Sequence, residues 1–481
     1  MGNRRRTVSI HILDDDSLLH VFYLYRPFLS GEDQDDHARL AGGKDIGTRG
    51  RWWYNLAHIC QRWRNIIFRS ASYLGLSLVC THGTPVADML AHSPPLPLIV
   101  HYATEGRNIT TDDEEGIILA LEQRDRVLRV RLTVVDTSLL EKFIAVMDEE
   151  FPILEYLIIT LPIEDNSTIL MFPETFQAPH LRLLWLRCFA LPMGSRLLTT
   201  AVSLVSLYLV MVHPSTYFHP NTLLQWISHM PQLETLTIYF LFSIPNRNVE
   251  MQPTHTPIIP LVTLPNLHSI QFRGVSTYLE ALARRISTPR LEKLKIVFFN
   301  QLTFSVPCLL EFMSTTENLR FNTAAVKFSD RRARVEAYYH GETGAAFNMR
   351  IYCWHLDWQV SSMAQISNSL SQMFSAVEHL ILQHEVHGRS SEEHNEVDRT
   401  EWRRLLRPFR NVKTLRIDNG LVKDLSHCLQ LEGEELCLEL LPELQELMYS
   451  GSRRSSDTGD GFTSFIDARR NAGHPVTLVR R

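Results

Sequence analysis

The histidines around position 384 come closest to a catalytic motif in this sequence. A zinc-protease helix requires His-Glu-x-x-His, with the second histidine four residues after the first, so that both ligands share one helix face. The segment begins His384-Glu385, but the fourth following position is Gly388 and a histidine stands at 387 instead. His394 lies nearby in a run of acidic residues. We interpret this segment as an acidic exposed loop and predict no metal site.

Other motifs that carry chemistry are also missing. The seven cysteines contain no pair separated by two residues, which excludes a zinc ribbon or a thioredoxin-type site. Gly42-Gly43-Lys44 lacks the leading glycine of a phosphate-binding loop, and neither Gly-x-Ser-x-Gly nor Gly-x-Gly-x-x-Gly occurs. We therefore predict a protein with no catalytic residues, no cofactor and no metal. A hydrolase with an unrecognised site is the weakest alternative.

Composition and charge restrict the class of protein. Apolar residues make up 44% and charged residues 21% of the 481-residue chain, as in globular proteins, and the net charge is −5. No basic field exists to attract nucleic acid or an anionic membrane. The basic start at Met1–Thr7 is not followed by an apolar signal region, and the uncharged apolar stretch 197–212 is too short to span a bilayer. Together with seven scattered cysteines that offer no disulfide framework, these features predict that the protein is located in the cytosol or nucleus.

A short apolar pattern recurs through most of the chain after residue 120. Its order is apolar, two residues, apolar, one residue, apolar, and successive copies begin about 29 residues apart. Apolar residues at helical spacing precede several copies, and in six of them a proline stands two residues before the first apolar position. Each unit is predicted to be a helix, a proline stop and a short strand. The ten copies begin at Val127, Leu154, Leu181, Leu204, Leu233, Leu267, Leu291, Val377, Val412 and Leu444.

One such unit cannot bury its apolar face alone, so the units are expected to stack with their strands parallel. The period and pattern resemble leucine-rich repeats, of the longer and looser kind found in ubiquitin-ligase receptors. The long gap between the copies at Leu291 and Val377 predicts two degraded repeats within 292–376. Residues 450–461 are predicted to be a loop, and 462–481 a closing helix and strand. An ordinary α/β globule with leucine-rich strands is the alternative.

Strand residues that lie between the inward apolar positions are expected on the open face of the stack. Aromatic and arginine side chains on an exposed sheet suit protein recognition. We predict a substrate surface that contains Tyr156, Trp185, Arg187, Tyr208, Tyr239, Arg273, Lys295 and Arg416, with Thr237, Gln271, Lys293, Ile381, Gln383 and Asp418 beside them.

Residues 10–78 show helical spacing of apolar residues instead of the recurring strand pattern. An aspartate at 14–16 can start a helix whose apolar residues recur at spacings of three and four, and a second apolar helical face follows a polar insertion at about 27–50. Segments 12–22 and 56–66, the latter with Ile59-Cys60-Gln61-Arg62-Trp63, together resemble an F-box. Segments 74–78, 84–90 and 94–100 look like the continuation seen in many mushroom-type fungal F-box proteins.

The resemblance implies a substrate-recognition subunit of an SCF-type (cullin–RING) E3 ubiquitin ligase. The F-box-like segment would dock on a Skp-type adaptor, and the repeats would hold a protein substrate. A helical cluster that packs only on its own chain is the alternative for this segment. By the resemblance, the adaptor-binding residues are Leu13, Leu18, Leu19, Phe22, Ile59, Cys60 and Trp63.

The predicted organisation is a small all-α F-box-like module at 8–80, followed by an irregular leucine-rich-repeat-like α/β solenoid with parallel strands at 81–481. The first functional hypothesis is a non-enzymatic substrate receptor. The alternative is a repeat scaffold that binds proteins without any link to ubiquitination.

Overall fold

The structure is a computed structural model, and it divides the chain into two compact units, Met1–Leu204 and Val205–Arg481. The N-terminal helices therefore belong to the same unit as the first strands. The insertion at 27–50, the acidic segment 386–396 and the loop 450–461 lie outside the described residues. The structure describes residues 12–26, 51–103, 107–134, 136–162, 170–192, 194–241, 260–299, 306–316, 318–319, 321–339, 344–385, 397–430, 438–449 and 462–480.

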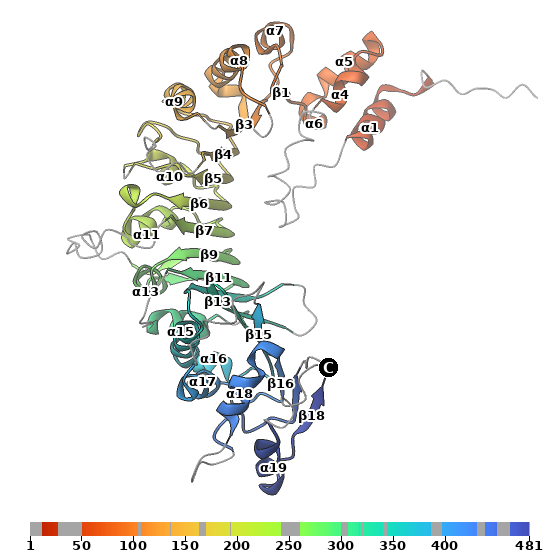
Figure 1. The fold of residues 1–481 in the computed structure, drawn as a ribbon. Coiled ribbons are helices and arrows are strands. Elements are labelled where there is room, and N and C mark those ends of the chain that lie inside the picture. Colours follow the sequence, from red (N-terminus) through yellow and green to blue (C-terminus); the bar gives the residue numbers. More distant parts are fainter. Residues whose placement is uncertain are drawn as a thin grey trace, which may run out of the picture. The chain divides into compact units, whose positions relative to one another are not determined.

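Unit 1 contains the N-terminal helices and a parallel sheet in the order β1-β2-β3-β4-β5 (Figure 1). Its helices are α1 (Asp15–Tyr25), α4 (Trp52–Ala57), α5 (Gln61–Arg69), α6 (Ala71–Leu74), α7 (Val86–His92), α8 (Thr111–Glu122), α9 (Thr137–Val146) and α10 (Arg196–Thr200). Its strands are β1 (Leu78–Cys80), β2 (Leu98–Ala103), β3 (Val127–Thr133), β4 (Tyr156–Thr160) and β5 (Leu183–Arg187).

Unit 2 contains a longer sheet in the order β6-β7-β9-β11-β14-β13-β12-β15-β16-β17-β18. Its strands are β6 (Ser206–Val212), β7 (Thr235–Phe240), β9 (Ser269–Gly274), β11 (Lys293–Phe298), β12 (Thr323–Ser329), β13 (Arg332–Tyr338), β14 (Phe347–Tyr352), β15 (His379–Glu385), β16 (Thr414–Ile417), β17 (Glu446–Tyr449) and β18 (Thr477–Arg480), and β8 (Val262–Thr263) pairs separately with β10 (Ile286–Ser287). Its helices are α11 (Pro220–Ser228), α13 (Ser276–Ala283), α14 (Pro307–Ser314), α15 (Leu356–Ser369), α16 (Ser371–Phe374), α17 (Arg399–Leu406), α18 (Val422–Leu429) and α19 (Thr463–Asn471).

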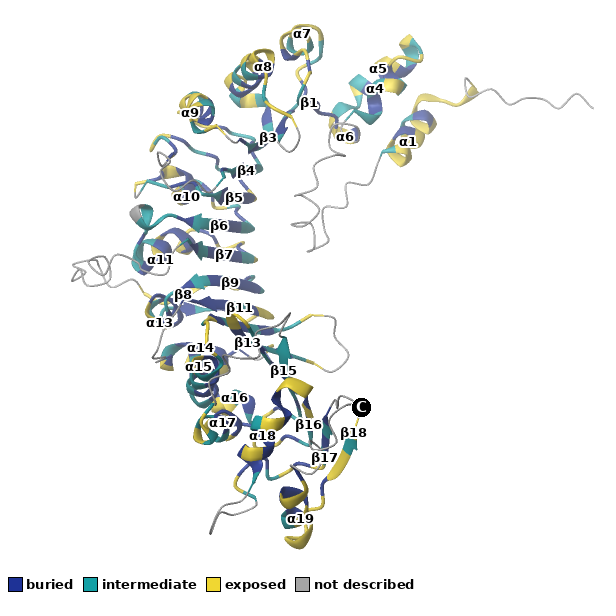
Figure 2. Ribbon diagram, in the orientation of Figure 1, coloured by how far each residue is buried: buried dark blue, intermediate teal, exposed yellow. Residues whose placement is uncertain are grey.

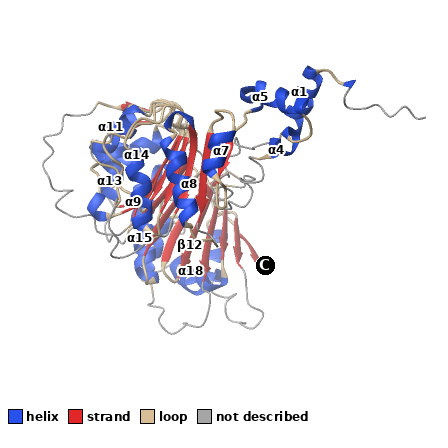
Figure 3. Ribbon diagram, turned by 90° about the horizontal axis from the view of Figure 1, so that it is seen from above, coloured by secondary structure: helices blue, strands red, loops and turns tan. Residues whose placement is uncertain are grey.

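All ten copies of the apolar pattern coincide with strands of these sheets, so the predicted α/β stack of mostly parallel strands is confirmed. The helices that alternate with strands lie on one side of the sheet in each unit, as α8 and α9 do in unit 1 and α11, α13 and α15 in unit 2, whereas α1, α4 and α5 lie apart from them (Figure 3). The first leucine of a copy is buried in the turn before its strand, as at Leu154 and Leu233. Each such leucine contributes about 2 kcal/mol by leaving water, which explains why the apolar pattern recurs with every unit.

The six recurring prolines occupy the second position of a four-residue turn. In the first of these turns, the Leu154 N–H donates to the Phe151 carbonyl at 3.3 Å, with Pro152 between them. The fixed φ of proline suits this position of a β-turn. The proline therefore ends one segment and shapes the turn into the next strand. The same bond closes Ala178–Leu181, Met230–Leu233, Leu264–Leu267, Thr288–Leu291 and Leu441–Leu444.

The region between β11 and β15 differs from the prediction of two degraded repeats. Strands β12, β13 and β14 form an antiparallel meander, and β14 pairs in parallel with β11 while β12 pairs in parallel with β15. The space between two regular repeats is thus filled by three strands, with their spatial order reversed from the chain order. The prediction failed because a hairpin needs no helix between its strands, so the repeat pattern disappears.

Candidate functional site

The open face of each sheet carries the polar side chains that alternate with buried apolar ones. Figure 2 shows buried and part-exposed residues alternating along the strands. In unit 1, Arg129 and Tyr156 are direct partners in the register, and the guanidinium lies 4.2 Å above the centre of the tyrosine ring. Trp185 and Arg187 on β5 are half-buried on the same face. The face of unit 1 is therefore an aromatic and cationic surface.

Beside these residues, His101 is buried opposite Arg131. Burial, followed by the positive charge of Arg131, lowers the pKa of His101 to about 4. The imidazole is therefore neutral at physiological pH, and the positive charge of this part of the face comes from the arginines.

In unit 2 the register lines up two rows of side chains on the open face. The first row contains Tyr208, Thr237, Gln271, Lys295 and Asn348 on consecutive neighbouring strands. The second row contains Tyr239, Arg273, Val297, Arg350, Arg334 and Lys327.

A hollow of about 540 Å³ opens on this face where β9, β11, β12, β13 and β14 meet. Its polar lining consists mainly of cations and hydrogen-bonding groups, and Gly344 and Ala345 lie at its rim. The charged and polar side chains that line it include Gln271, Lys293, Lys295, Lys327, Glu336, Tyr338, Asn348 and Arg350.

The Glu336 carboxylate in the hollow has three side-chain partners. Glu336 pairs with Lys327 at 3.0 Å and with Arg334 at 3.4 Å, and it accepts a hydrogen bond from the Asn348 amide at 3.0 Å. Burial raises the pKa of Glu336, but the hydrogen bond and charge of Lys327 and the nearby arginines outweigh it, so the pKa lies below its ordinary value. Arg334 also pairs with Glu385 at 3.0 Å.

Aromatic residues border the same rows. The Tyr239 hydroxyl donates to Gln271 Oε1 at 2.6 Å, which fixes the ring beside the hollow. The Arg273 guanidinium lies 5.6 Å from the ring centre of Tyr352 and 5.8 Å from that of Phe299. Cation–π contacts of this kind hold an arginine in place without neutralising its charge.

Most residues predicted for the substrate surface do lie on the open faces. Tyr156, Trp185, Arg187, Tyr239, Arg273 and Lys295 are half-buried there, and Arg416 is exposed beside Ile381. Tyr208 is an exception. Its side chain lies in the first row of the open face, but the residue is only 2% exposed and its pKa is raised to about 12, chiefly by burial, so neighbouring side chains cover it. Whether the exposed residues bind a substrate stays a prediction.

The N-terminal helices use several predicted adaptor-binding residues for their own core. Leu18 and Phe22 lie one turn apart on α1 and are buried, and the Phe22 and Trp63 ring centres are 4.8 Å apart. Trp63 is 6% exposed, so this predicted anchor has little surface left for a partner. The physical reason is that a small helical module needs its largest apolar groups to hold itself together. Of the others, Leu19 and Cys60 are half-buried, while Leu13 and Ile59 are exposed.

Part of the apolar pattern predicted for the first helix, including Val21 and Tyr25, is exposed on α1. Val21, Leu24 and Tyr25 are 41%, 65% and 62% exposed, although their spacing of three and four places them on one helix face. We call Val21, Leu24 and Tyr25 the α1 stripe. In the sequence, the apolar residues of this helix occupy more than one side of it. Such a pattern indicates that one apolar face is available to bind a partner.

The cationic residues of β12, β13 and β14 were also missed. Lys327, Arg334 and Arg350 fall within the region where the repeat pattern disappears, so no outward position was assigned there. The strict alternation of apolar and polar residues along Arg332–Tyr338 was a usable signal for a strand with one open face.

Other titratable groups have structural roles. Asp113 caps α8 together with Thr110, accepts the Gly83 N–H at 2.8 Å and lies 3.6 Å from His82. Within the described ranges, no group of three or more His, Cys, Asp or Glu residues is arranged to hold a metal ion. No helix among those same residues is long and apolar enough to cross a bilayer.

Comparisons with known proteins add little to this description. No protein-family model matches the chain, and no curated protein matches its sequence. A solved structure of the leucine-rich repeat-containing protein LegL7 from Legionella pneumophila aligns with 81% of this chain and 97% of its own length, at 11% identity and a TM-score of 0.24. A TM-score this low does not establish a shared fold, so the architecture rests on the strand pairing itself.

Proposed function

We propose that this chain is a non-enzymatic protein receptor that binds a partner on the open face of its sheet. The observation that carries this proposal is the hollow in unit 2, whose lining includes Tyr338 and Arg350, and where the Tyr239 hydroxyl bonds to the lining Gln271. Aromatic and arginine side chains in a concave site provide contact area and directed hydrogen bonds, as protein interfaces require.

We further propose that the N-terminal helices dock on a Skp-type adaptor, and that the chain thereby serves an SCF-type ubiquitin ligase. The F-box resemblance motivates this proposal, and the α1 stripe provides a surface for it. Arg62 pairs with Asp15 at 2.8 Å and donates to the Leu13 carbonyl at 2.7 Å, which ties the start of α1 to α5. The stripe is thereby held outward on an anchored helix. Exposed apolar groups gathered in this way mark interaction surfaces.

The adaptor proposal is tested by pull-down of the full chain with a purified Skp-type adaptor. The double variant Val21→Asp/Leu24→Asp places charge on the exposed stripe and leaves the Phe22–Trp63 core untouched. We expect wild type to bind and the double variant to bind at least about tenfold more weakly, because burying two carboxylates in an apolar interface is costly.

The control is Asn65→Asp, which adds one carboxylate at an exposed position of α5, against two in the double variant. It should bind the adaptor like wild type. A Trp63→Ala variant would not distinguish loss of adaptor contact from loss of folding, because it removes a core residue. Failure of the wild-type chain to bind any Skp-type adaptor refutes the ligase proposal.

The alternative is a protein-binding scaffold without a ligase, acting in the cytosol or nucleus. It shares the open sheet face but needs no adaptor. Partners that co-purify with wild type, and are lost with a Trp185→Ala/Tyr239→Ala variant, favour this alternative when adaptor binding is absent.

A further inference from the structure

The cations of the unit 2 face are more numerous than its acids. Lys327 and Arg334 have carboxylate partners in Glu336 and Glu385. Lys295 and Arg350 have none among the described residues: Lys295 contacts the Gln271 side chain at 3.5 Å, and the Arg350 Nε donates to Asn348 Oδ1 at 3.1 Å. Among the described residues, therefore, no carboxylate forms an ion pair with either of these two cations of the hollow.

Like charges also oppose one another in the register. Arg350 is the direct partner of Arg334, and Arg334 is the direct partner of Lys327, on three adjacent strands. The side chains of Arg334 and Lys327 are only 20% and 21% exposed, so solvent screens this repulsion incompletely. Directly opposed like charges destabilise a sheet. Arrangements that are unfavourable for folding, such as these like charges in direct register, are typical of functional sites.

The pKa of Lys295 also indicates that this site favours a bound anion. Burial, followed by the positive charge of Arg350, lowers the pKa of the Lys295 ammonium. A bound anion would offset both effects, because it would pair with the buried ammonium and reduce the repulsion from the guanidinium.

Resting on the proposed function of this face, we propose that the hollow binds an acidic, carboxylate-bearing peptide segment of the partner, with one Asp or Glu side chain between Lys295 and Arg350. An arginine fork beside a lysine suits a carboxylate. Gln271, Asn348 and Tyr338 supply hydrogen-bonding groups around the same space.

The face favours an acidic peptide over nucleic acid. Glu336 and Glu385 lie among the cations, where they would repel the continuous phosphate backbone of a bound strand. An extended peptide instead places charged side chains on one side about 7 Å apart, with uncharged residues between them. Such a peptide can place one carboxylate between Lys295 and Arg350 and present uncharged groups to the glutamates.

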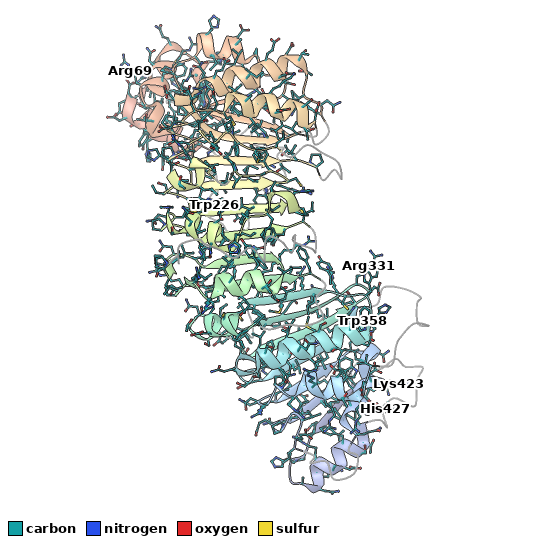
Figure 4. The ribbon with its side chains drawn as sticks, turned by 90° about the vertical axis from the view of Figure 1, so that its left-hand side faces the viewer. Arg69, Trp226, Arg331, Trp358, Lys423 and His427 are labelled. Carbon is teal, nitrogen blue, oxygen red and sulfur yellow. The ribbon has the colours of Figure 1, made fainter. Side chains whose placement is uncertain are left out.

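The proposal is tested by fluorescence anisotropy with a labelled short peptide of alternating glutamate and serine, and with its glutamine counterpart. The full chain is compared with the double variant Lys295→Gln/Arg350→Gln. The matched control is Lys423→Gln on α18, an exposed lysine on the helix-bearing side of unit 2 (Figure 4). A Lys295→Arg/Arg350→Lys variant keeps both charges.

We expect wild type to bind the glutamate peptide and not the glutamine peptide, with affinity that falls as salt is added. The double glutamine variant should bind at least about tenfold more weakly, whereas Lys423→Gln should bind like wild type and the charge-retaining variant within about threefold of it. The double variant should fold, because it removes repulsion and breaks no ion pair.

Several results would overturn the proposal. These are equal binding of both peptides, an unchanged affinity in the double glutamine variant, an equal loss with Lys423→Gln, or equal binding of single-stranded RNA that is weakened by the same double variant. Adaptor pull-down of the same preparations separates the two proposals. Capture of adaptor without peptide binding refutes only the acidic-peptide inference, and peptide binding without adaptor capture refutes only the ligase proposal.

Discussion

Arg469 on α19 is a buried cation that joins the C-terminal closing helix to the turn before β17. Its side chain is 0% exposed, and its guanidinium donates to the carbonyls of Leu441, Pro442 and Leu444 at 3.2, 2.9 and 3.0 Å. These three carbonyls belong to the turn that begins β17. Leu441 has a φ of 50°, in the left-handed region, so the turn also holds a strained residue.

We predict that Arg469→Met lowers the stability of this end by about 3–5 kcal/mol. Methionine keeps the length and the apolar contacts but removes the donors to all three carbonyls; the Leu441 carbonyl still accepts the Leu444 N–H, whereas the Pro442 and Leu444 carbonyls lose these bonds. An unsatisfied buried carbonyl costs about 1–3 kcal/mol, and part of this cost is offset because the variant no longer buries a charge. Arg469→Lys should be nearly as damaging, because one ammonium cannot match a fork that spans three carbonyls.

The assay is native-state hydrogen exchange of the full chain, followed at the amides of β18. The Thr477 N–H donates to the Gln445 carbonyl at 2.8 Å, so its protection reports whether β18 stays on the sheet. Exchange there should accelerate by about 100-fold or more, since each 1.4 kcal/mol corresponds to a factor of ten.

The matched control is the adjacent residue of the same type. Arg470 is 66% exposed and pairs only at the surface with Asp467, so Arg470→Met should change stability by less than about 0.5 kcal/mol. If the β18 amides exchange at the same rate in Arg469→Met and Arg470→Met, the buried guanidinium does not stabilise the closing helix and strand, and the reasoning is refuted.

Two further predictions concern the sheets. His101 has a folded pKa of about 4 against an ordinary value of 6.5, so the unfolded chain takes up its proton first as the pH falls. This site should therefore cost roughly 3 kcal/mol of stability between pH 6.5 and 4, and the urea-unfolding free energy of His101→Gln should fall less over that range; equal pH slopes would contradict this. At Gly274, a Cβ atom would lie 2.7 Å from Phe272 Cζ and 3.0 Å from Phe240 Cδ2, so Gly274→Ala should lower stability by about 1–3 kcal/mol in the same assay, and an unchanged midpoint would show that these rings move aside easily.

The sequence was most informative where structure follows from local periodicity. The ten apolar patterns predicted ten strands, and the closing helix and strand were predicted at the right place, because alternation and helical spacing depend only on neighbouring residues. The prolines were recognised as boundaries. Their role as the second residue of a turn emerged from the backbone hydrogen bonds.

Candidate sites were predicted only in part, for reasons that concern contacts between distant segments. Tyr208 and Trp63 have the residue type and the spacing of surface anchors, yet both are buried by their own units. Arg350 and Lys327 carry the charge of the hollow, but they lie on strands that the repeat pattern did not reveal. Burial and charge clustering depend on which strands become neighbours, and that information is not local.

The sequence by itself determined the repeated turn-and-strand unit and its α/β class, because a recurring apolar pattern with a fixed proline can satisfy its apolar face only by stacking. Only the tertiary structure decided the order β14-β13-β12 within the sheet of unit 2, and with it the cationic hollow. That order arises from pairing between strands, which brings Arg350, Arg334 and Lys327 into register although they are distributed over three strands of the chain.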